Sequence, residues 1–336
     1  MNDLISIILP VYNGEKFIEE AINSTLSQTY KQFELIIVND CSTDNTLDIV
    51  KRISLKDKRI ILISNKTNQK LPASLNIGHK KAKGKFVTWT SDDNVLLPNF
   101  LEDLVYQIIK QNVDVVYSNY EVINQIGDVK RKHKAGEIEH ILFGNQIGAS
   151  FLYRKEVYDE LGGYDDSLFL LEDYDFWLRA SIKHKFYHLN KVLYKYRLHS
   201  DSLTSNIYSN QFVKDNHQKA VVKMFKKISN QLLWKTETLD FLVANFLNQN
   251  NLVAIYLNNK KLIDGDIFRF NLIFFNLSKQ QYGLHLLLRQ HLTSKKENRN
   301  IKTLINVFKK DRTLLVHSNF SKKNTLNYLL KSISNL

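Results

Sequence analysis

Acidic and amide side chains follow two apolar runs of the sequence at the points where those runs end. Asn39 and Asp40 close one run rich in Ile and Val, and Asp92 and Asp93 come just after another. Carboxylates in such positions can hold a divalent cation, bind a hydroxyl or accept a proton. The alternative is that they only cap the helices that follow. Because two separate runs end in this way, we favour one shared functional site.

A further acidic pair opens a segment, 173–182, whose apolar spacing predicts a helix. Glu172 and Asp173 stand at its start. The positive end of the helix dipole favours an ionised carboxylate, and such a carboxylate can take the proton of an attacking hydroxyl. The alternative is that these acids only complement the charge of the helix terminus.

Two consecutive glycines, Gly162 and Gly163, precede this acidic pair. They predict a tight turn, where the lack of side chains lets the backbone approach a sugar. An ordinary helix C-cap after Leu161 is the alternative.

Strands and helices alternate through the first part of the chain. Apolar runs predict strands at 4–10, 33–38, 60–63, 86–90 and 113–117. Helical spacing predicts helices at 14–28, 44–55 and 71–83, with a further helix opened by Pro98. This alternation indicates an α/β fold with a Rossmann-like, mostly parallel sheet and helices on both faces. The carboxyl ends of the strands then share one edge, which brings the acidic clusters together.

Neither glycine-rich device for binding a nucleotide occurs in the sequence. There is no G-x-x-x-x-G-K-[ST] loop, and no G-x-G-x-x-G follows the first strand. A diphosphate can instead be bound through a divalent cation that carboxylates hold, and Asp92 and Asp93 suit that role. A solvated turn is the alternative for this pair.

Composition sets outer limits on the class of protein. The chain has 336 residues, 43% of them hydrophobic and 24% charged, which predicts a folded protein of about two domains. A single cysteine, Cys41, excludes a disulfide scaffold and a multi-cysteine metal site. No apolar run has the roughly 18 residues of a spanning helix, and the start lacks a signal-peptide pattern. We therefore expect a cytoplasmic protein, with peripheral docking on the inner face of the cell membrane left open.

The net charge of +13 lies almost entirely in the last part of the chain. Residues 1–205 hold 26 Lys and Arg against 27 Asp and Glu, whereas residues 206–336 hold 21 against 7. All three prolines and nine of the eleven glycines lie in the first part. We expect a catalytic domain at 1–205 and a basic, mostly helical region at 206–336.

The basic region has several alternative functions. It can form a helical bundle that packs on the catalytic domain or on a second copy, giving a homo-oligomer. It can lie on an anionic membrane surface, where each nearby Lys or Arg contributes roughly 1 kcal/mol. A solvated lysine-rich face is an equal alternative. We expect no nucleic acid partner, because no recognised module is present and Arg is scarce.

The ordered motifs resemble family 2 glycosyltransferases with the GT-A fold. The resemblance covers about residues 4–205 and leaves out the basic region. It is carried by the segments Ile5–Asn13, Ser27–Thr29, Glu34–Asp44, Leu161–Asp165, Glu172–Arg179 and Tyr196–His199, with Ser202 and Ser205. The segment 145–151 resembles the loop that members of this family place near the acceptor.

The resemblance implies a role for each matching residue. A donor-nucleotide site would comprise Pro10, Tyr12, Asn13, Asp40, Lys70, Asp92, Arg197 and His199. Within it, Asp40 would accept the imide hydrogen of uracil, Lys70 would lie near that base, and Asp92 would contact the ribose. The metal ligands would be Asp93 and His199, and the metal manganese or magnesium. The general base would be Asp173, with Glu172 beside it, while Arg197 would help to hold the diphosphate.

Two positions depart from the family pattern. The common V-D-D-G-S carries Asn39 in place of its first acid, and the common D-x-D-D carries Thr90 in place of its outer acid. The first change keeps the acid expected to recognise the base. The second leaves fewer protein ligands for a metal.

The expected activity is that of an inverting glycosyltransferase. It would move a sugar from a nucleotide diphosphate donor, UDP-linked by preference, to a hydroxyl of a glycan or a lipid-linked acceptor. The resemblance places this chemistry in the synthesis of a bacterial surface polysaccharide. Two alternatives remain: a nucleotidyltransferase, and a non-catalytic glycan- or membrane-binding assembly protein with a degenerate site.

Overall fold

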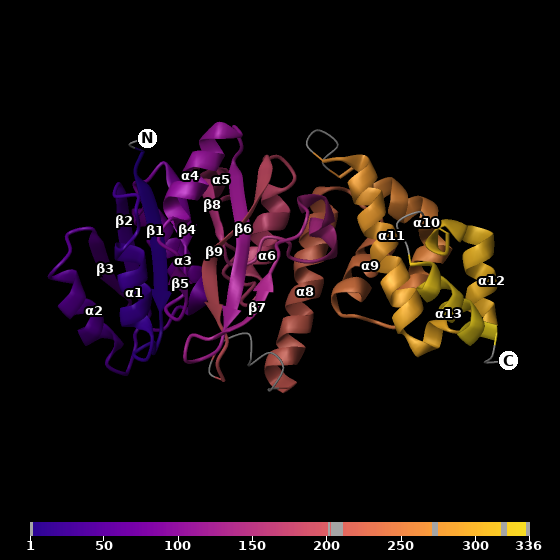
Figure 1. The fold of residues 1–336 in the computed structure, drawn as a ribbon, viewed down its shortest axis with the longest axis horizontal. Coiled ribbons are helices and arrows are strands. Elements are labelled where there is room, and N and C mark those ends of the chain that lie inside the picture. The colour runs from indigo at the N-terminus through magenta and orange to yellow at the C-terminus, as the bar shows by residue number, and fades with distance from the viewer. Residues whose placement is uncertain (1–2, 201, 203–210, 271–274, 317–320, 334–336) are drawn as a thin grey trace. The chain divides into compact units, whose positions relative to one another are not determined.

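The computed structural model describes residues 3–200, 202, 211–270, 275–316 and 321–333. The chain divides into two compact units (Figure 1). One comprises Met1–Ile138 and Asn145–Ala220, and the other comprises Glu139–Gly144 and Val221–Leu336. We call the first the catalytic unit, after the activity expected from the sequence for residues 1–205, and the second the helical unit. That the functional boundary falls at residue 205 stays a prediction.

The catalytic unit is built on a nine-stranded mixed sheet. Its strands are β1 (Ile5–Val11), β2 (Phe33–Asn39), β3 (Ile60–Ser64), β4 (Phe86–Trp89), β5 (Val95–Leu96), β6 (Val115–Ile123), β7 (Val129–His133), β8 (Phe151–Arg154) and β9 (Phe186–Arg197). The strand order is β3-β2-β1-β4-β8-β6-β9-β5, with β7 paired to β6. The strands β1 to β4 pair in parallel, as the alternation predicts. Antiparallel pairs join β8 to β4 and β6, and β5 to β9.

Helices connect the strands of this unit. They are α1 (Ile18–Leu26), α2 (Thr46–Ser54), α3 (Lys70–Lys81), α4 (Phe100–Lys110), α5 (Lys155–Leu161) and α6 (Glu172–Ala180). The α/β fold class predicted from the sequence is therefore confirmed. The pattern did not predict β5, β7, β8 or β9, because short or half-exposed strands lack a continuous apolar run.

Both faces of the sheet are covered, and β2 shows why. Phe33, Leu35 and Ile37 pack into a large core together with residues of α1, α2 and α4. The alternate residues Ile36 and Val38 belong to a second cluster, which includes Ala82 just after α3. Successive strand residues point to opposite faces, so a run that is apolar throughout requires helices on both sides.

The strand register places the predicted acidic clusters along one edge. Val11 pairs with Asn39 across β1 and β2. Ile8 pairs with Trp89, and the N–H of Thr90 donates to the carbonyl of Ile8 at 2.9 Å. The chain therefore leaves β1, β2 and β4 on the same side of the sheet, where Asp40 and Asp92 follow.

The helical unit consists of helices and two 3-10 turns with a core of their own. They are α9 (Thr236–Phe246), α10 (Leu252–Ile267), α11 (Leu277–Ser294), α12 (Ile301–Lys310) and α13 (Lys322–Ile333), with the 3-10 turns η2 (Lys296–Asn298) and η3 (Arg312–Leu314). The long helix α8 (Gln211–Gln231) enters this unit at Val221. Residues 139–143 of the turn η1 (Ile138–Phe143) also belong to it. Phe225, Phe241, Tyr256, Leu284 and Leu288 are fully buried. The described residues contain no helix that combines the length and the hydropathy needed to span a bilayer.

Candidate active site

The loop after β1 is locked to the loop after β2. Asn13 has a positive φ of 55°, and its Oδ1 accepts a hydrogen bond from the N–H of Thr43 at 2.8 Å. The next residue, Gly14, donates its N–H to Oγ1 of Thr46 at 2.8 Å. A Cβ at Gly14 would overlap Oδ2 of Asp92, so the missing side chain is what lets Asp92 approach this loop. Asn13 and Asp92, both predicted to bind the donor, therefore lie close together.

Asp40 fixes the start of α3. It is 4% exposed, and its carboxylate accepts hydrogen bonds from the N–H of Gln69 at 2.8 Å and of Lys70 at 2.9 Å. Asn65 donates its Nδ2 to the same carboxylate at 2.8 Å. The structure thus brings Asp40 and the backbone of Lys70 together. Contact with a uracil base remains a prediction, which would use the remaining lone pairs of Asp40.

The two departures from the family pattern are buried. Asn39 is 2% exposed, and its Oδ1 accepts the N–H of Ser42 at 3.4 Å, which steadies the turn after β2. Thr90 is also 2% exposed and shares a hydrogen bond with the hydroxyl of Tyr194 at 2.7 Å. Asn39 therefore stabilises the turn after β2, and Thr90 links the residue after β4 to β9. Of the other predicted donor residues, Pro10 is buried within β1, and Tyr12 is 50% exposed at its end.

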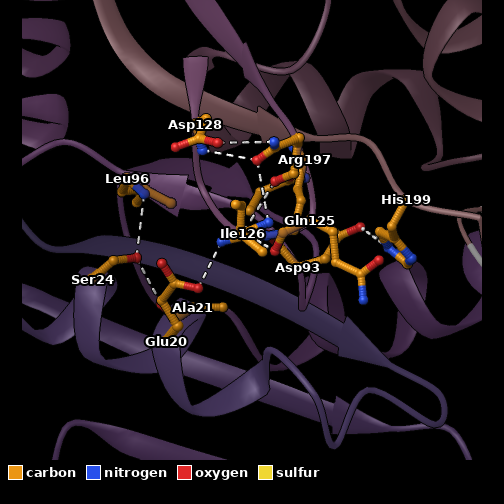
Figure 2. Close-up of polar contacts among 12 residues, drawn as sticks. Glu20, Ala21, Ser24, Asp93, Leu96, Gln125, Ile126, Asp128, Arg197 and His199 are labelled. Carbon is orange, nitrogen blue, oxygen red and sulfur yellow. Dashed lines mark hydrogen bonds and ion pairs between the residues drawn. The ribbon is translucent and has the colours of Figure 1, made fainter. Parts of the chain in front are cut away.

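Asp93 and His199 meet although they are 106 positions apart. Nε2 of His199 lies 3.0 Å from Oδ2 of Asp93, and Figure 2 shows the imidazole beside this carboxylate. Oδ1 of Asp93 is buried and has no hydrogen-bond partner among the residues that the structure describes. The ring of His199 lies against Phe17, with the ring centroids 5.2 Å apart. The two predicted metal ligands are therefore adjacent, and one carboxylate oxygen remains available.

Arg197 is hydrogen-bonded to the main chain of Asp93 (Figure 2). Its Nε donates to the main-chain carbonyl of Asp93 at 2.8 Å, and its backbone N–H donates to Oδ1 of Asn94 at 2.8 Å. The same guanidinium bonds the carbonyl of Gln125 at 2.9 Å and Oε2 of Glu20 at 2.6 Å. Arg197 is only 2% exposed, so in this structure it positions Asp93. The predicted contact with a diphosphate remains a prediction, and it would require some of these bonds to be exchanged.

Burial disfavours the charged form of both acids after β4. Burial, followed by the neighbouring charge of Asp93, raises the pKa of Asp92 to about 8. Burial also raises the pKa of Asp93, although its contact with His199 works in the opposite direction. Within the described ranges, no cluster of three or more His, Cys, Asp or Glu side chains is placed to hold a metal. A divalent cation bound here would therefore take few protein ligands and rely on oxygens of the donor.

Asp173 belongs to a second group, at the start of α6. Its Oδ1 accepts the N–H of Tyr174 at 2.6 Å, and its Oδ2 accepts a hydrogen bond from Nδ2 of Asn145 at 2.9 Å. Burial raises the pKa of Asp173, whereas these two hydrogen bonds lower it. Glu172 is 4% exposed, and burial and the charge of Asp173 raise its pKa to about 8. A negative charge on Asp173 therefore disfavours a second charge on Glu172 beside it.

The last members of the E-D-x-D-x-x-x-R motif hold the double-glycine turn. Oδ2 of Asp175 and Nε of Arg179 form a buried ion pair at 2.7 Å. Arg179 also donates to the carbonyls of Leu161 at 2.9 Å and Gly163 at 2.8 Å. Gly162 and Gly163 both have positive φ, 70° and 86°, and they form the C-cap of α5, with the N–H of Gly163 donating to the carbonyl of Tyr158 at 3.1 Å. The helix C-cap named as the alternative is therefore what the structure shows, and an approach of this backbone to a sugar stays a prediction.

Sequence reasoning placed Asn145 in a loop near the acceptor but did not predict its contact with Asp173, and it assigned no role to Glu20 or to the Asp175–Arg179 pair. The i,i+4 spacing of Asp175 and Arg179 on one helix was a usable signal. The contacts of Asn145 and Glu20 cross 28 and 177 positions, and no periodicity marks such contacts.

Known proteins are similar to this chain in sequence. Residues 6–176 match the model of glycosyl transferase family 2. An uncharacterised glycosyltransferase of Rickettsia typhi is 33% identical over 318 residues, covering 88% of this chain and 97% of its own. Another, from Methanocaldococcus jannaschii, is 32% identical over 206 residues, covering 58% of this chain and 71% of its own.

Solved structures agree on the fold. TarS 1–349 of S. aureus, in complex with UDP-GlcNAc, superposes with a TM-score of 0.60 at 21% identity, covering 92% of this chain and 90% of that one. The mannosyltransferase PcManGT from Pyrobaculum calidifontis, in complex with GDP-Man and Mn2+, gives a TM-score of 0.52 at 14% identity. It covers 100% of this chain and 87% of that one.

The mixed sheet, with an acid pair just after its fourth strand, superposes on solved glycosyltransferases of the GT-A fold. The match over residues 6–176 and the relative from Rickettsia typhi give the family: the chain belongs to glycosyl transferase family 2. It is a glycosyltransferase that uses a nucleotide-sugar donor.

Proposed function

We propose that the chain transfers a sugar from a UDP-linked donor, with inversion, to a hydroxyl of a glycan or a lipid-linked acceptor. The observation that carries this proposal is the contact of His199 with Asp93, which leaves Oδ1 of Asp93 buried and unpartnered among the described residues. One oxygen of this carboxylate has no hydrogen-bond donor among the described residues, and a cation that carries the donor diphosphate would supply a partner for it.

Manganese or magnesium fits this place. Asp93 and His199 would hold the cation, and its charge would offset the cost of ionising two carboxyls whose pKa burial raises, those of Asp92 and Asp93. When bound, the cation would offset the negative charge of the donor diphosphate. Arg197 would keep the main chain of Asp93 in place, and Asp92, beside Gly14, would contact the ribose.

Asp173 would act as the general base. An acceptor hydroxyl is a weak nucleophile, and a carboxylate within hydrogen-bond reach can remove its proton as it attacks. Inversion needs only this one base, because the nucleotide diphosphate is already an activated leaving group. Glu172, whose pKa of about 8 keeps it mostly protonated at neutral pH, would leave Asp173 as the charged member of the pair.

An anionic membrane surface is the partner that we propose for the helical unit. Ile305 and Phe308 on α12 are 45% and 52% exposed, and Leu326 and Leu330 on α13 are 57% and 58% exposed. The same two helices carry Lys302, Lys309, Lys310, Lys322, Lys323 and Lys331. Apolar side chains beside lysines suit anionic lipid. Co-sedimentation with phosphatidylglycerol vesicles but not phosphatidylcholine vesicles would support this; self-association without vesicle binding would contradict it.

Two measurements test the catalytic proposal. Calorimetric titration with UDP, GDP, dTDP and CDP, with and without manganese, should show manganese-dependent preference for UDP. Release of UDP from a panel of UDP-sugars, including UDP-GlcNAc, should fall by about 100-fold or more in Asp173→Asn while UDP affinity is retained. Turnover that is unchanged in Asp173→Asn would overturn the assignment of the base.

A further inference from the structure

The edge strand β7, which lies beside β6 in the catalytic unit, is strongly basic (Figure 1). Lys130, Arg131 and Lys132 lie on this strand and Lys134 follows it, and all four side chains are exposed. None of the four forms an ion pair with another residue that the structure describes. Charged side chains on an edge strand discourage pairing with other chains, which accounts for the charge but not for the neighbours of Arg131.

Arg131 shares one face of the β6–β7 hairpin with two aromatic rings. His133 lies directly opposite Tyr120, and Arg131 lies opposite Val122. Residues opposite each other, and residues two positions apart, point to the same face of a sheet. The rings of Tyr120 and His133 stack with their centroids 4.4 Å apart, which holds the tyrosine in place. Burial, and then the charge of Arg131, lowers the pKa of His133, so this imidazole is mostly neutral near neutral pH.

Tyr120 packs on the turn that bonds the proposed base. Nδ2 of Asn145 donates to Oδ2 of Asp173 at 2.9 Å, and Oδ1 of the same amide accepts the N–H of Gly148 at 3.3 Å. A Cβ at Gly148 would lie 2.7 Å from Cε1 of Tyr120 and 3.2 Å from its hydroxyl oxygen. All four residues belong to the catalytic unit, so the aromatic face of the hairpin lies next to the base.

The hydroxyl of Tyr120 is available as a hydrogen-bond donor. It has no hydrogen-bond partner within the part of the chain that the structure describes. Burial first, and then Tyr196 and the negative charge of Asp173, raise the pKa of Tyr120 to about 12, although Arg131 opposes the rise. The hydroxyl therefore keeps its proton at neutral pH, and its interaction with the charge of Asp173 places it near the base.

The same hairpin also reaches the residues proposed to hold the cation. Ile123 on β6 pairs with Arg197 on β9. Figure 2 shows the guanidinium of Arg197 beside Gln125 and Asp93, whose main-chain carbonyls it bonds. Three positions of an extended strand, roughly 10 Å, separate Ile123 from Tyr120. The hairpin therefore runs from the proposed cation ligands to the proposed base, and an acceptor hydroxyl has to lie between donor and base to react.

We propose that the β6–β7 hairpin binds the acceptor glycan and that this acceptor is anionic: Arg131 binds a phosphate or carboxylate group, and the hydroxyl of Tyr120 donates to an acceptor hydroxyl beside the base. This inference rests on the proposed function and specifies the chemical class of the acceptor. A planar guanidinium bonds two oxygens of either anion at once. Lys130, Lys132 and Lys134 add positive potential along the strand, which attracts a glycan with repeated negative charge.

The test is the binding of fluorescently labelled oligomers to the full chain, with UDP and manganese present, followed by fluorescence anisotropy. A glycerol phosphate tetramer and tetragalacturonate carry the two kinds of anion, and maltotetraose is the neutral glycan of matched length. An oligothymidylate of equal charge reports the binding of any polyanion. At least one anionic glycan probe should bind about tenfold or more tightly than maltotetraose, because hydrogen bonds to charged groups are the stronger ones.

Three variants locate the binding site. Arg131→Gln should weaken binding of the anionic probe by about tenfold or more. Lys132→Gln is the matched control, since it removes one charge from the same strand but lies opposite Glu121, on the other face. It should weaken binding by less than about threefold, because an exposed charge without direct contact is screened. Tyr120→Phe keeps the stacked ring and should weaken binding by about three- to tenfold while UDP affinity stays at the wild-type value.

Anionic binding that falls in Arg131→Gln and much less in Lys132→Gln supports the inference, and the tighter of the two anionic probes identifies the anion. No binding of either anionic glycan, equal binding of maltotetraose, equal losses in the two variants, or equally tight binding of oligothymidylate would overturn it. Unchanged binding in Tyr120→Phe would overturn the placement of the acceptor beside the base. The assay needs no turnover, so its outcome is separate from that of Asp173→Asn, which tests the proposed function by UDP release.

Discussion

Nε2 of His199 lies 3.0 Å from Oδ2 of Asp93, and the other oxygen of that carboxylate is buried without a partner among the described residues. We therefore expect Asp93→Asn to weaken manganese-dependent binding of UDP by at least about tenfold, because a neutral amide is a poor ligand for a hard cation. Calorimetric titration of UDP with manganese measures this. Asp48→Asn, at an exposed position on α2, is the control and should bind as the wild type does. Equal affinity for UDP in the two variants would show that Asp93 does not bind the cation.

Arg197 should matter for folding as well as for binding. Its planar group bonds Asp93, Gln125 and Glu20 at once, and a lysine amine cannot replace that fork. Arg197→Lys should lower the free energy of unfolding by about 2–4 kcal/mol, as measured by urea denaturation. Arg52→Lys should change it by less than about 0.5 kcal/mol, since Arg52 forms an exposed ion pair. Similar small losses in both variants would contradict the positioning role.

Glu172 should make the protein less stable as the pH rises. Burial, and then the charge of Asp173, raises the pKa of Glu172 from 4.5 to about 8. Between these values the folded chain holds a proton that the unfolded chain has released. The free energy of unfolding therefore falls with rising pH in this window, by up to about 1.4 kcal/mol per pH unit from this group.

Urea denaturation at a series of pH values from 5 to about 9 tests this expectation. Glu172→Gln should flatten the decline, and its gain in stability over the wild type should grow toward high pH. Glu156→Gln, at an exposed position on α5, should keep the slope of the wild type. A slope that persists unchanged in Glu172→Gln would show that the carboxyl ionises without cost in the folded state.

The two glycines after α5 should differ in their tolerance of a side chain. Both have positive φ, but a Cβ at Gly162 meets nothing within 4 Å, whereas one at Gly163 lies 2.7 Å from Oδ1 of Asn76 and 2.9 Å from the hydroxyl of Tyr158. Gly162→Ala should cost about 1 kcal/mol of stability, from backbone strain alone. Gly163→Ala should cost at least about 2 kcal/mol, because it also disturbs the hydrogen bonds of Asn76. Thermal or urea unfolding of the two variants measures these losses of stability. Equal losses in Gly162→Ala and Gly163→Ala would refute the steric argument.

The alternation of strands and helices could be predicted from local sequence pattern, and so could the edge at which Asp40, Asp92 and Asp93 gather. Apolar runs bury both faces of each strand, and parallel strands end on the same side, so these positions follow from local pattern and chain direction. The double-glycine turn is equally local, since it depends on positive φ at Gly162 and Gly163.

The partners that hold these carboxylates could not be predicted from the sequence, because they come from distant parts of the chain. Glu20 reaches Arg197 across 177 positions, His199 reaches Asp93 across 106, and Asn145 reaches Asp173 across 28. Such contacts depend on how β5 and β9 pair at the edge of the sheet and on where the chain returns after residue 144. Periodicity along the sequence records which face of an element is buried, and it carries no record of which distant side chain an exposed polar group will meet.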